Sequence, residues 1–369
     1  MEQTTDLHVR IDGVDRSYPR GTRYQTIAED VQAQYPHRIL LVNREGRLCE
    51  LSKSLDRDCT LKMVTTVDKP GMQTYERSAV LLMLKAFYDV VGRAQIDRVT
   101  VEYSISHALF VRAAGRFSLD QALLEQVEAR MRTLVSLALP IQKHSVNTWD
   151  AVDFFQKNGM PDKARLLSYR ISSHVNLYTL DGFTDYFYGY MVPDTSYLTC
   201  FGLEPYEDGF VLRLPDQADP ARLAEFQPSA KVFRTLHDAS DLAMSMGIST
   251  VGELNTAISE GQATQMVLAR EAMMEKEIGD RRPVLLRQDH LLPPPVHPAH
   301  RLRDASPPHR DRQLLQKPGG HPPGREWSVR FRGAGRHGCG AVQRRHVPPA
   351  AGRDGGAAPL QLHQGRPGV

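Results

Sequence analysis

The first 66 residues follow a pattern of apolar and polar positions that predicts strands around one short helix. Residues 7–11 alternate between the two classes and lead into Asp12-Gly13, a dipeptide typical of a two-residue hairpin turn. The later elements of this part are predicted to be a helix at 24–34 and strands at 39–43 and 61–66. The pattern therefore predicts a small α+β unit at the start of the chain.

The next part of the chain is mostly helical in its periodicity. From Thr74 the sequence YERSAVLLMLKAFYDV repeats apolar residues at helical spacing. A capping box at 118–121 predicts the start of a second helix, and Thr148 is predicted to cap a third helix that ends at Gly159. An aromatic block at 174–198 then predicts strands. The fold class expected for the chain is α+β.

The composition changes at Arg281. Beyond this residue the chain contains no Ile, Tyr, Met, Thr or Asn, about fifteen arginines against one lysine, and most of the prolines and histidines. A segment of this kind buries too little apolar area to offset its conformational entropy. We therefore expect residues 1–280 to be folded and residues 281–369 to be a disordered tail.

The net charge, the cysteines and the lack of long apolar runs favour a protein without disulfides or membrane spans. The formal net charge is +3, and the four cysteines show no CxxC spacing, which is typical of a reduced protein rather than a disulfide scaffold or a zinc site. The N-terminus is polar, and no apolar run approaches the roughly 20 residues that span a bilayer. We expect a cytoplasmic protein with no metal site and no membrane partner.

Two segments of the first part, PRGTRYQTIAEDV and VNREGRLCELSKSLDRDCTLKMVTT, resemble the TGS domain, a β-grasp fold. The resemblance implies a helix laid across a mixed sheet over residues 1–67. Such domains bind RNA, nucleotide or a partner domain and perform no chemistry. A binding role for this part is what the resemblance implies.

Residues 68–215, with the aromatic block HVNLYTLDGFTDYFYGYMVPDTSYL, resemble the second additional domain of threonyl-tRNA synthetase, which is its editing domain. In that family the editing site combines an HxxxH pair on the first helix with a CxxxH pair on a later loop. Aligned on ERSAVLLML and DYFYGYMVP, these positions hold Arg77, Leu81, Phe187 and Met191. Such a quartet offers neither metal ligands nor a base, so we expect an editing-like domain without hydrolytic activity.

The order of these regions resembles the N-terminal half of bacterial uridine-kinase-like nucleoside kinases. The stretches DKPGMQTYERS, EDGFVLRLP and TVGELNTAISEGQ add to this likeness. It implies that residues 216–280 are a linker and helices, including one at 250–280, that lead to a kinase domain. That domain would use ATP and Mg²⁺ to phosphorylate the 5′-hydroxyl of uridine or cytidine. It should open with a P-loop, GxxxxGK[ST], and the chain contains no such motif.

The sequence after residue 281 contains a P-loop when it is read one base out of register. Synonymous codons for RPVLLRQDH also encode GPSSSGKT, which indicates a frameshift that removed the kinase domain. In the chain as written, the P-loop positions hold Arg282, Arg287, Gln288 and Asp289. We therefore expect this chain to bind no cofactor and to be catalytically inactive. A disordered linker, a nucleic-acid-binding arm and a histidine metal site are the alternatives for the tail.

The alternative to a truncated kinase is a stand-alone module that binds RNA or nucleotide through residues 1–215. Aromatic rings can stack on bases, and basic groups can contact phosphates. The candidate residues are Lys143, Arg170, Tyr186, Tyr188 and Tyr190. A competing interpretation of DYFYGYM is that alternate aromatic residues line the core of a sheet. We also expect the helix at 250–280 to expose an apolar face through which the chain self-associates.

Overall fold

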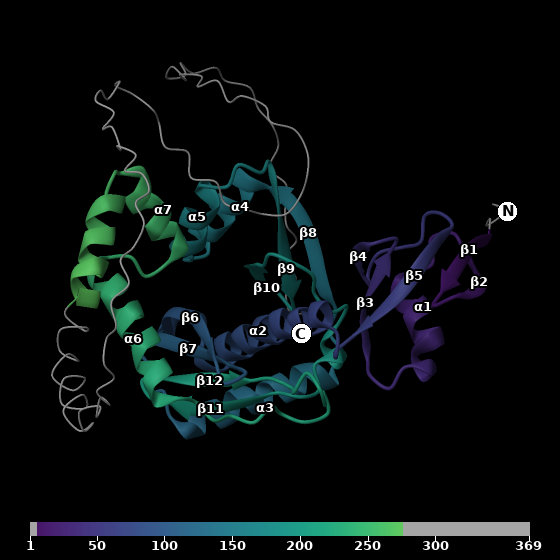
Figure 1. Cartoon of the computed structure of the whole chain (residues 1–369), viewed down its shortest axis with the longest axis horizontal. Helices are drawn as coiled ribbons and strands as arrows, with labels where there is room; N and C mark the ends of the chain where they lie inside the picture. Colours follow the sequence, from purple (N-terminus) through teal and green to yellow (C-terminus); the bar gives the residue numbers. More distant parts are fainter. Residues whose placement is uncertain (1–5, 276–369) are drawn as a thin grey trace, which may run out of the picture. The chain divides into compact units, whose positions relative to one another are not determined.

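A computed structural model describes residues 6–275 of the chain (Figure 1). These residues form a mixed α+β structure, which confirms the predicted fold class. The expected tail and its P-loop positions, Arg282, Arg287, Gln288 and Asp289, lie outside the described residues. Within the described part, no helix is long and apolar enough to cross a membrane.

The N-terminal residues form a five-stranded mixed sheet with one α-helix. The elements are β1 (Asp6–Ile11), β2 (Val14–Pro19), α1 (Tyr24–Val31), a 3₁₀ turn (Gln32–Gln34), β3 (Ile39–Arg44), β4 (Arg47–Glu50) and β5 (Cys59–Thr65). The strand order is β2-β1-β5-β3-β4, with β1 and β5 parallel and the other neighbours antiparallel. One helix packed on a mixed sheet is the arrangement that the TGS resemblance implied for this part.

Local sequence explains the hairpin and the helix of this sheet. Asp12 and Gly13 have φ values of 46° and 90°, the left-handed conformations that a type I′ turn between β1 and β2 requires. On α1, the side chains of Tyr24, Ile27 and Val31 are buried at helical spacing and pack with the strands in one core. The predicted hairpin and helix are both confirmed.

Helix α2 (Lys69–Val91) follows directly on the sheet. Pro70 lies in its first turn, where proline is well tolerated, and Gly92 at φ 84° ends it. Most of its side chains from Thr74 to Phe87 are buried, and the helix contacts β3, β5, β6 (Ile96–Ile105), β9 (His174–Leu180) and helix α3 (Gln121–Ser136). A helix that is apolar on most of its circumference has to be covered on several sides, and these strands and α3 cover it.

Two antiparallel sheets and further helices complete the described part. The strand orders are β11-β12-β7-β6 and β10-β9-β8. The strands are β6 (Ile96–Ile105), β7 (Ala108–Gly115), β8 (Ile141–Asn147), β9 (His174–Leu180), β10 (Phe183–Tyr186), β11 (Gly202–Tyr206) and β12 (Gly209–Arg213). The helices are α3 (Gln121–Ser136), α4 (Thr148–Lys157), α5 (Pro161–Ser168), α6 (Ala230–Ser245) and α7 (Val251–Ser259), with 3₁₀ turns at Arg93–Gln95 and Thr195–Tyr197.

The caps of α3 and α4 differ from the predicted ones. Asp120, not Ser118, caps α3, because its carboxylate accepts a hydrogen bond from Leu123 N at 2.9 Å. Asn147 caps α4, and Thr148 is the first helical residue. Both capping residues have the extended backbone that this position requires, which is why each takes the role from its neighbour.

Two predicted elements are shorter in the structure. The strands of the aromatic block end at Tyr186, because the chain then turns through Gly189, whose φ is 130°. The aromatic block therefore lines a sheet only in part. The predicted C-terminal helix is interrupted: α7 ends at Ser259, and Gly261 at φ 83° precedes a second helical segment at 263–275.

Candidate functional site

Helix α2 lies against the loop that follows β10, so the two predicted remnants of an editing site are neighbours. Arg77 Nε donates to the Tyr190 carbonyl at 3.1 Å, and Val192 N donates to the Ser78 hydroxyl at 3.0 Å. Gly189 permits this approach, since a Cβ there would lie 2.7 Å from the guanidinium carbon of Arg77. Its φ of 130° also favours glycine. The helix and the loop thus pack directly against each other.

The four editing-site positions provide no catalytic group. Leu81 and Met191 are buried, and Arg77 and Phe187 are half-buried. Burial lowers the pKa of Arg77 and the charge of Glu76 opposes this, but a guanidinium in a protein keeps its proton and cannot act as a base. In the described part of the chain, no group of three or more His, Cys, Asp or Glu side chains is placed to hold a metal ion.

A buried carboxylate, Glu50 at the end of β4, lies beside this site and was missed by the sequence analysis. It is 2% exposed and accepts hydrogen bonds from Lys143 Nζ at 2.9 Å, Tyr178 OH at 2.7 Å and Met191 N at 3.2 Å. Glu50 therefore links the first sheet to β8, β9 and the loop after β10. A signal was present in the sequence: one glutamate stands inside the apolar run LCEL.

Tyr178 is the hydroxyl donor of this buried group. Its oxygen lies 2.7 Å from Glu50 Oε1 and 2.7 Å from the Gly189 carbonyl, and its single proton serves one of them at a time. Burial raises the pKa of Tyr178, and the charge of Glu50 raises it further, so the phenol stays neutral. Lys143 Nζ lies 5.3 Å from the Tyr178 ring centroid. Lys143, predicted to contact RNA, instead binds this internal carboxylate.

A second set of side chains gathers on the surface. The guanidinium carbon of Arg170 lies 5.9 Å from the ring centroid of Tyr186 and 5.7 Å from that of Tyr188. Arg170 is exposed, Tyr188 is 81% exposed, and the adjacent Ile171 is fully exposed. We call Arg170, Tyr186 and Tyr188 the arginine–tyrosine cluster. Three predicted RNA-binding residues thus lie together, whereas Tyr190 is half-buried and its carbonyl binds α2.

A buried ion pair positions Tyr186. Its backbone N–H donates to Asp185 Oδ1 at 2.5 Å, and the same carboxylate pairs with Lys163 of α5. Burial raises the pKa of Asp185, and the positive charge of Lys163 opposes this shift. Because Asp185 is 1% exposed, the pair anchors the backbone at the end of β10, where Tyr186 lies.

Apolar side chains are also exposed between residues 251 and 275. They are Val251, Ile258, Val267, Leu268 and Met274, each about half exposed. An uncovered apolar face in this region is what the predicted self-association requires. Self-association itself stays a prediction.

Comparison with known proteins identifies relatives among threonine–tRNA ligases. The chain is 31% identical over 203 residues to the enzyme of Symbiobacterium thermophilum, a match that covers 53% of this chain and 30% of that protein. It is 25% identical over 184 residues to the enzyme of Parabacteroides distasonis and 22% identical over 192 residues to that of Francisella tularensis subsp. novicida. These matches cover 50% and 52% of this chain and 28% and 30% of the relatives.

The chain thus spans less than a third of the length of these relatives. The chain matches no protein-family profile. The similarity supports the predicted threonyl-tRNA-synthetase-like region. The TGS-like and kinase interpretations stay predictions.

Proposed function

We propose that the synthetase-like part of this chain is an accessory region that binds RNA without acting on it chemically. The arginine–tyrosine cluster is the observation that supports binding. Tyr188 presents an exposed aromatic face, and no carboxylate of the described residues forms an ion pair with Arg170. Bases stack on such rings, and a guanidinium contacts phosphates as well as aromatic faces. The relatives are named for a transfer RNA, which makes RNA the ligand class we propose.

The editing-site positions support binding without hydrolysis. Arg77, Leu81, Phe187 and Met191 stand where that chemistry would need ligands or a base, and two of them are buried apolar side chains. The neighbouring carboxylate, Glu50, is already bound by three donors and cannot reach a ligand. An RNA that docks here would therefore be bound and released unchanged.

Two finer proposals concern the flanking regions. The helix packed on a mixed sheet supports a TGS-like domain over residues 1–67 as a second binding module. A nucleoside kinase is the second candidate function, supported by GPSSSGKT in the adjacent reading register. Re-sequencing the gene around codons 278–284 tests it, and an uninterrupted frame that ends in this same protein sequence without those bases would refute it.

Fluorescence anisotropy with a labelled transfer RNA tests the RNA proposal on the full chain. The Tyr188→Ala variant should bind roughly 10-fold more weakly, since one lost stacking contact costs about 1–3 kcal/mol. Tyr188→Phe should bind like the parent, because the ring is kept. Affinity should fall steeply as salt rises, since phosphate contacts release counterions.

Arg170→Ala should weaken binding and flatten the salt dependence. Arg222→Ala is its matched control, because the Arg222 side chain is 84% exposed and pairs only with Asp219 three residues earlier. Equal affinity of the parent and Tyr188→Ala, or equal losses in Arg170→Ala and Arg222→Ala, would refute the proposed interface.

A further inference from the structure

A cavity of about 370 Å³ adjoins the arginine–tyrosine cluster and shares Tyr186 with it. Strand β6 lines it with Arg98 and Val101, and α5 lines it with Leu166. Helix α6, the connection to α7 and the first turn of α7 supply the opposite wall, including Met244. Tyr186 lines this cavity, and its ring centroid lies 5.9 Å from the guanidinium carbon of Arg170, so the cavity and the surface cluster share this residue.

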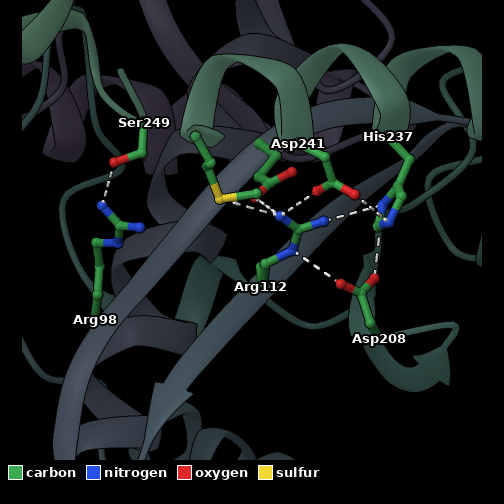
Figure 2. Close-up of polar contacts among 8 residues, drawn as sticks. Arg98, Arg112, Asp208, His237, Asp241 and Ser249 are labelled. Atoms are coloured by element: carbon green, nitrogen blue, oxygen red, sulfur yellow. Dashed lines mark hydrogen bonds and ion pairs between the residues drawn. The ribbon is translucent and has the colours of Figure 1, made fainter. Parts of the chain in front are cut away.

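Polar contacts hold the α6–α7 wall against the sheet (Figure 2). Figure 2 shows Arg112 of β7 among Asp208, His237 and Asp241. Its guanidinium lies 3.1 Å from Asp208 Oδ2 and 3.3 Å from Asp241 Oδ1, and its terminal nitrogen lies 3.0 Å from His237 Nδ1. Because Asp241 and His237 belong to α6, this cluster fixes α6 over β7 and preserves the cavity.

Four charged side chains line the cavity, and two of them, Arg98 and Asp162, form no ion pair within the described residues. Lys163 pairs with the buried Asp185, and the Glu102 carboxylate lies 3.3 Å from Arg112. Arg98, in contrast, donates to the Ser249 hydroxyl at 2.8 Å, and none of the carboxylates in residues 6–275 forms an ion pair with it. Figure 2 shows Arg98 beside Ser249, apart from the Arg112 cluster. The cavity therefore contains a guanidinium that lacks an anionic partner in the described structure.

The residues that line the cavity indicate which kind of anionic ligand would fit beside Arg98. Tyr186 is the aromatic residue of the lining, and Val101, Leu166 and Met244 make much of the remaining surface apolar. A planar, mostly apolar group with one attached anion fits this combination, and a base with a phosphate is such a group. The volume is within the range of about 300–1,000 Å³ that is usual for small-molecule sites.

We infer that this cavity binds one nucleotide, with its phosphate on Arg98 and its base against Tyr186. The inference rests on the proposed RNA binding, because the shared residue Tyr186 makes the cavity an extension of the arginine–tyrosine cluster. The nucleotide is either free or the terminal unit of a bound RNA, since both present the same base and phosphate.

Isothermal titration calorimetry of the full chain with AMP and UMP tests this site. Both should bind, whereas adenosine, uridine and inorganic phosphate should each bind at least 10-fold more weakly, because each lacks one half of the contacts. Arg98→Ala should weaken AMP binding at least 10-fold, and Arg98→Lys should keep part of the affinity.

Ser249→Ala is the matched control, since it removes the hydrogen-bond partner of Arg98 and leaves the guanidinium in place; because it also removes a hydrogen bond to Glu253, urea unfolding should show that the variant is folded. It should bind AMP at least as tightly as the parent. The inference falls if neither nucleotide binds, if inorganic phosphate binds as tightly as AMP, or if Arg98→Ala binds like the parent. It also falls if Ser249→Ala loses as much affinity as Arg98→Ala, because the contact would then be structural.

A competition experiment between AMP and labelled RNA distinguishes a free nucleotide from the end of a bound RNA. It also allows the cavity inference and the RNA proposal to fail independently. Displacement of labelled RNA by AMP would identify the ligand as an RNA end, and AMP binding without displacement would identify it as a free nucleotide. Tyr188→Ala should weaken RNA binding and leave AMP binding unchanged. RNA binding that depends on Tyr188 without any AMP binding would refute the cavity alone, and AMP binding without RNA binding would refute the RNA proposal alone.

Discussion

Replacement of Lys143 by methionine should destabilise the protein by about 3 kcal/mol, because it leaves the buried Glu50 carboxylate without its ion-pair partner. The Glu50 side chain is 3% exposed and the Lys143 side chain 26% exposed, and their charged atoms lie 2.9 Å apart. Removal of one partner of a buried ion pair typically costs about 3–5 kcal/mol. The lower end applies here, since Tyr178 OH and Met191 N remain as hydrogen-bond donors to Glu50.

Removal of the Glu50 charge should destabilise the protein less than removal of the Lys143 charge. In Glu50→Gln the amide oxygen can still accept from Tyr178 and Met191, and the partly exposed Lys143 can turn toward water. We expect about 1–2 kcal/mol, the usual cost of a lost charge-assisted hydrogen bond. The double variant Glu50→Gln/Lys143→Met should cost little more than Glu50→Gln alone. The coupling energy between the two positions should therefore be about 2 kcal/mol or more.

Urea unfolding of the four proteins measures these values, provided that the slope of free energy against urea stays constant. The surface pair Arg57–Glu45 is the matched control, because its charged atoms lie 3.4 Å apart and its side chains are 63% and 49% exposed. Its coupling energy should stay below about 1 kcal/mol. A cost under about 1 kcal/mol for Lys143→Met would refute the reasoning, and so would equal coupling energies for the two pairs.

Two further predictions follow from the packing and from the capping of α7. Gly71→Ala should destabilise the protein by about 1–3 kcal/mol, because the added Cβ would lie 1.8 Å from the Thr65 carbonyl oxygen. Urea unfolding measures this change. An unchanged free energy of unfolding would contradict the close packing of α2 on β5. Burial raises the pKa of Glu253, but hydrogen bonds from Ser249 and Thr250 lower it more, so it lies below its ordinary value of 4.5. A lowered folded-state pKa means that the stabilisation is present above pH 4.5 and is lost as the pH falls through the folded value. The protection of α7 amides against hydrogen exchange, taken relative to the intrinsic rate at each pH, should therefore fall below pH 4.5, and Glu253→Gln should remove this dependence; an unchanged protection profile in that variant would contradict the assignment.

Local sequence was sufficient to predict those elements whose structure depends on neighbouring residues alone. The alternation at 7–11, the turn at Asp12-Gly13 and the apolar face of α1 each depend on residues only a few positions apart, and each is confirmed. The caps were predicted one or two positions from their true places, since several short polar residues stand next to each helix start. Asp120 and Asn147 are the caps because their backbone is extended, which sequence does not reveal.

The candidate site could be predicted only in part, because the sequence does not reveal which side chains lie on the surface of the folded chain. The aromatic pattern indicated that tyrosines near 186–190 are candidates, but it did not separate those on the surface from those in the interior. The structure places Tyr186 and Tyr188 beside Arg170 and leaves Tyr190 half-buried. Lys143 also looked available for RNA until its carboxylate partner was known.

By itself, the sequence determined the fold class, the hairpin, the helix and two later strands of the first 66 residues, and the kinship of the region that follows; β4 was not among the predicted strands. Only the tertiary structure determined that Glu50 is buried, because its donors stand 93, 128 and 141 residues further along the chain. A periodic pattern shows which side of an element faces inward, but not which other element it will meet. Ion pairs, cavities and surface clusters depend on the contacts between elements that are far apart in the sequence. In this protein those contacts decide where a ligand can bind.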